Sequence, residues 1–87
     1  MSLTAPALNA LSELVDDART TADRAAGMGL AQTCRRIESL ALDLDAARTR
    51  LVEDGPDYLD AAWAFLDAGR LILAQYRIQL AQEPARA

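Results

Sequence analysis

The segment from Leu30 to Val52 has an apolar stripe that repeats with the period of an α-helix. On a wheel of about 100° per residue, the side chains of the stripe fall within an arc of about 140°. Every charged residue of the segment except Arg48 lies outside that arc. This pattern predicts a helix with one face in a core, which other helices must cover. The stripe consists of Leu30, Thr33, Cys34, Ile37, Leu40, Ala41, Leu44, Ala47, Leu51 and Val52.

Two further segments have helical periodicity and can supply that cover. Residues 6–26 carry an apolar stripe that begins with leucine and valine and ends in alanine, and residues 56–82 are the most apolar part of the chain. We therefore predict an all-α fold, a three-helix up-down-up bundle that is oligomeric. Its helices span about 6–26, 30–53 and 56–82 of a single domain over residues 1–87, with residues 1–5 and 83–87 frayed. The expected core is Leu11, Val15, Ile37, Leu40, Leu44, Leu51, Leu59, Leu66 and Leu73.

The two breaks between these helices differ in clarity. Asp54-Gly55-Pro56-Asp57 combines a glycine that ends one helix with a proline that suits the first turn of the next. Gly27-Met28-Gly29 has two interpretations. With Gly27 as the left-handed residue after a helix end, the first two helices form a hairpin, which we favour. Alternatively, the stripe continues through this segment as a stutter in one long bent helix.

Composition excludes several classes of function. The net charge is −4, and all nine basic residues are arginine, so an acidic surface disfavours nucleic-acid binding. No uncharged apolar run approaches the ~18 residues of a membrane span, and the N-terminus does not read as a secretory signal. With no histidine and a single Cys34, the usual metal sites and nucleophile arrangements are absent. We expect a cytoplasmic, non-catalytic protein with no cofactor and no metal, and a buried, unreactive Cys34.

The third helix carries more apolar surface than two neighbouring helices can cover. Besides the face centred on Leu66, a second face lies about 100° around the wheel. Aromatic residues dominate the energetics of protein interfaces, so this second face predicts a site for a protein partner or for a second copy in a homodimer. The predicted partner-binding residues are Tyr58, Phe65, Ile72 and Tyr76, together with Gly69 as a point of close helix approach.

Three arginines lie on apolar faces and support an alternative function. Arg48 lies in the middle of the central stripe, and Arg70 and Arg77 lie one heptad apart on the third helix. In one interpretation, each side chain extends past its neighbours to a surface aspartate. In the other, the three guanidinium groups converge on a dicarboxylate or phosphate, which they bind in bidentate fashion. The sequence therefore predicts a helical interaction protein, such as an adaptor, chaperone-like subunit or regulator. The alternative is an anion-binding bundle that acts as a small enzyme.

Overall fold

The computed structural model describes residues 3–83, and within this range the chain forms helices and no strands. Helix α1 spans Ala5–Gly27, α2 spans Ala31–Asp54, a 3₁₀ turn (η1) spans Gly55–Tyr58, and α3 spans Leu59–Gln82. The all-α prediction is confirmed. Of the termini expected to fray, residues 1, 2 and 84–87 lie outside the described range, whereas Ala5 is already helical.

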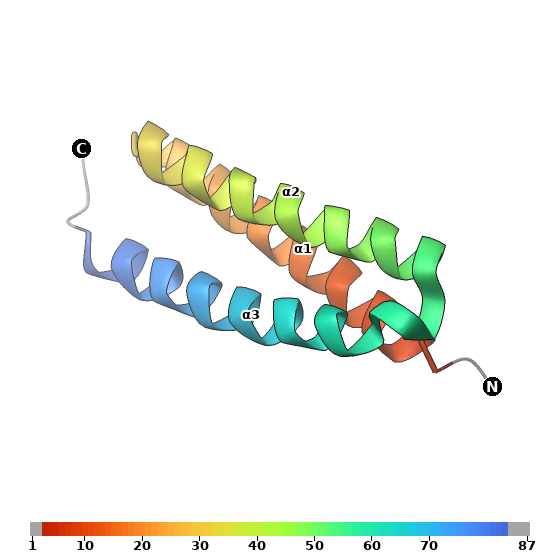
Figure 1. The fold of residues 1–87 in the computed structure, drawn as a ribbon. Coiled ribbons are helices and arrows are strands. Elements are labelled where there is room, and N and C mark those ends of the chain that lie inside the picture. The colour runs from red at the N-terminus through yellow and green to blue at the C-terminus, as the bar shows by residue number, and fades with distance from the viewer. Residues whose placement is uncertain (1–2, 84–87) are drawn as a thin grey trace.

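The helices lie side by side in a rod of about 51 × 17 × 17 Å. Figure 1 shows that α1 and α3 run in the same direction and that α2 runs antiparallel to both. Helices α1 and α2 contact each other much more extensively than either contacts α3. Helix α3 is therefore the least closely packed of the three helices.

A tight turn separates α1 from α2, in agreement with the hairpin interpretation. The Leu30 N–H donates to the carbonyl of Ala25 at 3.0 Å, and the Gly29 N–H donates to that of Ala26 at 3.0 Å. These two bonds are those of a Schellman motif, whose left-handed position falls on Gly29, with φ of 78°. The choice of Gly27 for that position was wrong, because α1 continues through Gly27 before it ends.

The second junction contains no coil, because η1 follows α2 directly and α3 follows η1. Gly55 adopts φ of 63°, which interrupts the helical backbone after α2. The 3₁₀ turn then ends where the Leu59 N–H donates to the carbonyl of Pro56. The third helix was expected to begin at Pro56, but the α-helix begins only at Leu59. The tighter turn reverses the chain in four residues.

The core contains most of the residues expected there. Leu44, Leu51 and Leu66 are almost fully buried. Leu40 and Leu59 were also expected in the core, but they are only partly buried and pack against its edge. Val52 was assigned to the central stripe but is exposed. Val52 falls at the edge of the predicted arc, in the last turn of α2, where a small error in azimuth moves a side chain out of the core. Other expected core residues that are buried are Leu11, Val15, Ile37 and Leu73.

Candidate functional site

Helix α3 and the end of η1 place the four large side chains of the predicted partner-binding face along one side of the rod. Phe65 and Ile72 lie two turns apart on α3 and are 46% and 40% exposed. Tyr58 and Tyr76 are half-buried and pack against the core. We call these four residues the aromatic face. It combines two anchored rings with two apolar side chains that the chain's own helices leave accessible.

Gly69 does not belong to this face. It is buried, and a Cβ atom at this position would lie 2.9 Å from Cδ2 of Leu44 and 3.1 Å from Cδ2 of Leu14. The close helix approach predicted at Gly69 thus occurs within the chain, where α3 meets both other helices. Gly69 is therefore a core residue, not a partner-binding one.

Helix α2 adds residues to the site that the sequence interpretation missed. Four of its residues, together with Tyr58 and Phe65, line a shallow hollow of about 380 Å³. A second hollow of about 210 Å³ continues along α3 beside Ile72 and Tyr76, between Gln75 and Gln79. The available signal was the pair of opposite charges, Asp43 and Arg50, one heptad apart on the outer side of α2 with the small Ala46 between them. The four residues of α2 that line the hollow of about 380 Å³ are Asp43, Ala46, Ala47 and Arg50.

The charges of this surface lie at its α2 edge. The Arg50 Nε atom lies 3.1 Å from Oδ2 of Asp54, and its guanidinium carbon lies 5.2 Å from the centre of the Tyr58 ring. Asp43 takes part in none of the ion pairs found within residues 3–83. The outer side of α3 beside the aromatic face carries alanine and glutamine and no charge, at Ala61, Ala64, Ala68, Gln75 and Gln79. A docking helix therefore meets an uncharged strip with one basic and one acidic group along its border.

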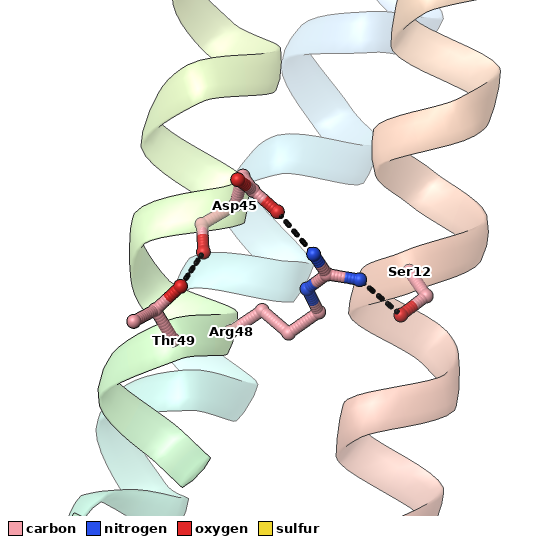
Figure 2. Close-up of polar contacts among 4 residues, drawn as sticks. All are labelled: Ser12, Asp45, Arg48 and Thr49. Carbon is pink, nitrogen blue, oxygen red and sulfur yellow. Dashed lines mark hydrogen bonds and ion pairs between the residues drawn. The ribbon is translucent and has the colours of Figure 1, made fainter. Parts of the chain in front are cut away.

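The three arginines considered for an anion site do not share one place, because Arg48 lies apart from Arg70 and Arg77. Figure 2 shows Arg48 extending from α2 toward α1, where its Nη1 atom donates to the Ser12 hydroxyl at 3.1 Å. Its Nη2 atom lies 2.6 Å from Oδ1 of Asp45, one turn earlier on α2. The Thr49 hydroxyl donates to the Asp45 carbonyl at 3.1 Å. Arg48 thus joins α1 to α2 and is held by a carboxylate of its own helix.

Arg70 and Arg77 share a different hollow, between α1 and α3. Glu13 and Asp17 of α1 line the same hollow, which has a volume of about 250 Å³. The Arg77 Nη2 atom lies 3.9 Å from Oδ2 of Asp17, and Arg70 Nη1 lies 3.9 Å from Oδ1 of Asp67. Every arginine of the predicted cluster therefore has an aspartate within ion-pair distance. An anion that entered this hollow would be repelled by the carboxylates of Glu13 and Asp17.

Cys34 is buried in the core and lines none of the three hollows described above. Burial raises the pKa of the Cys34 thiol. The thiol also donates a hydrogen bond to Oε1 of Glu38, with Sγ 3.4 Å away, and this bond raises the pKa further. The negative charges of Glu38 and Asp23 act in the same direction, while Arg35 lowers the pKa. A thiol in this environment is a poor nucleophile, because the thiolate is the reactive form.

We expect Cys34 to react with a thiol reagent at least about tenfold more slowly in the folded protein than in urea at pH 8. Because the folded state holds the thiol proton more tightly, the contribution of Cys34 to the free energy of unfolding should be constant at neutral pH. It should then fall as the pH rises above about 9. A Cys34→Ala variant should lack that fall. Rapid stoichiometric labelling of the native protein would contradict the prediction.

Residues 3–83 contain no group of three or more side chains suited to holding a metal ion. None of the helices described combines the length and hydropathy that crossing a bilayer requires. Comparison of the chain with protein-family models, with curated proteins and with solved structures finds no match.

Proposed function

We propose that this chain is a small non-catalytic interaction protein of the cytoplasm, an adaptor, chaperone-like subunit or regulator. Its folded unit is a three-helix up-down-up bundle, which binds another protein chain through the aromatic face. The observation that carries the proposal is the exposure of Phe65 and Ile72 on an uncharged strip of α3. Large apolar side chains gathered at one surface are typical of interaction sites, and aromatic residues contribute most to binding.

The form of the surface supports a helical partner. One hollow lies beside Phe65 and the other beside Ile72, two turns further along α3, so the pair suits side chains of a helix laid along α3. Tyr58 and Tyr76 are already packed against the core, which lowers the conformational entropy lost on binding. The anion-binding alternative has no comparable support, because each of its arginines lies beside an aspartate.

The test compares wild type with the double variant Phe65→Asp/Ile72→Asp. If the face binds protein, wild type should either self-associate or retain a specific partner from lysate of its native source. The double variant should do neither. Self-association raises the thermal midpoint with protein concentration between about 10 µM and about 1 mM, whereas an anion site raises it on addition of succinate or phosphate. Absence of any association that the double variant abolishes would overturn the proposal.

A further inference from the structure

The exposed side of α3 repeats every seven residues. Ala61, Phe65, Ala68, Ile72, Gln75 and Gln79 follow one another at alternating steps of four and three, and none of them is buried. Alternating steps of this size are those of a coiled-coil seam. The seam lies on the side of α3 turned away from the buried residues Ala62, Leu66 and Leu73. It is thus a packing stripe that no helix of the same chain covers.

Large and small residues alternate along this stripe in a self-complementary order. Consider a second α3 laid antiparallel, with a two-fold axis between residues 66 and 67. Phe65 then lies opposite the partner's Ala68, and Ile72 lies opposite the partner's Ala61. In a two-fold symmetric pair every contact occurs twice, so both copies of Phe65 and of Ile72 pack against an alanine. A parallel pairing instead places Phe65 against the partner's Phe65 and leaves alanine against alanine.

The charges on α2 fit the same axis. Leu44 of α2 lies against Gly69 of α3, and the two helices run in opposite directions, so residues 66–67 of α3 lie level with Ala46 and Ala47. Asp43 and Arg50 are equally far from that level on either side and line the same hollow as Phe65. Across the axis, each Asp43 therefore faces the partner's Arg50. The small, exposed Ala46 allows the two copies of α2 to approach at the centre. In a parallel pairing, like charges would oppose each other.

We infer that the partner is a second copy of this chain, bound antiparallel through the α3 stripe and the α2 edge as a two-fold symmetric homodimer. The inference rests on the proposed function and adds the identity of the partner and the geometry of the complex. Size complementarity along α3 and charge complementarity along α2 select the same axis independently.

The first test exchanges charges. Asp43→Arg places two arginines opposite each other on both sides of the axis, and Arg50→Glu does the same with acidic groups. Each single variant should weaken self-association by about tenfold or more, measured by sedimentation. An equimolar mixture of the two variants should form heterodimers, because every pair across the axis then has opposite signs. Unfolding curves of each variant at low concentration control for loss of the fold.

The second test measures the register in a Cys34→Ala background. An oxidised mixture of Ala61→Cys chains and Ile72→Cys chains should form disulfide-linked dimers. Neither variant should do so alone, because two copies of one position lie about 16 Å apart along the antiparallel pair. A disulfide requires Cα atoms within about 7 Å.

Each outcome separates this inference from the proposed function. Crosslinking of Ala61→Cys with itself would overturn the antiparallel geometry. A chain that stays monomeric at about 1 mM, yet captures another protein in a way that Phe65→Asp/Ile72→Asp abolishes, would overturn the homodimer and leave the proposed function standing. If neither self-association nor capture depends on the aromatic face, both fail.

Discussion

Replacing Leu44 by alanine should lower the free energy of unfolding by about 2–5 kcal/mol. Leu44 is 1% exposed, and its terminal methyl groups fill the space beside Gly69 where the three helices meet. Removing them leaves a cavity that three packed helices cannot close without moving. For a chain of this length, whose total stability is about 4–13 kcal/mol, this is a large share. Urea denaturation followed by circular dichroism measures the loss.

Leu42 provides the matched control, because it is a leucine of the same helix that is 65% exposed. Leu42→Ala should change the free energy of unfolding by less than about 0.5 kcal/mol. A loss below that value for Leu44→Ala would show that the core of α2 has been misassigned.

The same site predicts a coupling between two substitutions. In wild type, a methyl group at Gly69 meets Cδ2 of Leu44 at 2.9 Å, so the gain of about 1 kcal/mol in helix propensity is offset by the overlap. In the Leu44→Ala background the overlap with Leu44 disappears, and the new methyl group fills part of the cavity. Gly69→Ala should therefore stabilise the Leu44→Ala variant by about 1 kcal/mol or more, beyond its effect in wild type. Additive effects would contradict this account of the packing.

The sequence could predict the helices and most of the core because periodicity reports directly on which face of a helix is buried. Ile37, Leu44 and Leu51 recur every seven residues, and all three are buried. The error at the end of α1 arose because local backbone geometry, which periodicity does not report, decides which glycine ends the helix. Gly27 and Gly29 are equally suited by residue type to the left-handed position, and only the hydrogen bonds of Leu30 and Gly29 assign it to Gly29.

The candidate site was less predictable because a wheel describes one helix at a time. The angular positions on the wheel placed Phe65 and Ile72 on one side of α3, but they gave no information on which part of α2 lies beside these residues. Asp43 and Arg50 therefore went unnoticed. For the same reason, Arg48 and Arg77 seemed able to meet, although one extends to Ser12 and the other to Asp17. The relative placement of helices depends on close contacts such as that of Gly69 with Leu44.

The substitution of Phe65 and Ile72 by aspartate should separate association from folding. Both side chains are nearly half exposed, so a carboxylate at either position reaches water without entering the core. The double variant should keep a cooperative unfolding transition and the helical circular dichroism of wild type. Its self-association should weaken at least about a hundredfold, because four charges enter an apolar interface in each dimer. Sedimentation at matched concentrations measures the second effect.

Two single substitutions show whether this result is specific. Leu66→Asp alters the neighbour of Phe65, but Leu66 is fully buried between the helices, so this variant should unfold. Leu42→Asp adds a charge at an exposed apolar residue on another side of the molecule, so it should affect neither folding nor association. If Phe65→Asp/Ile72→Asp unfolds as Leu66→Asp does, the aromatic face belongs to the core of a single chain. If it behaves as Leu42→Asp does, the aromatic face takes no part in self-association. If the aromatic face is an interface, Phe65→Asp/Ile72→Asp should be a folded monomer.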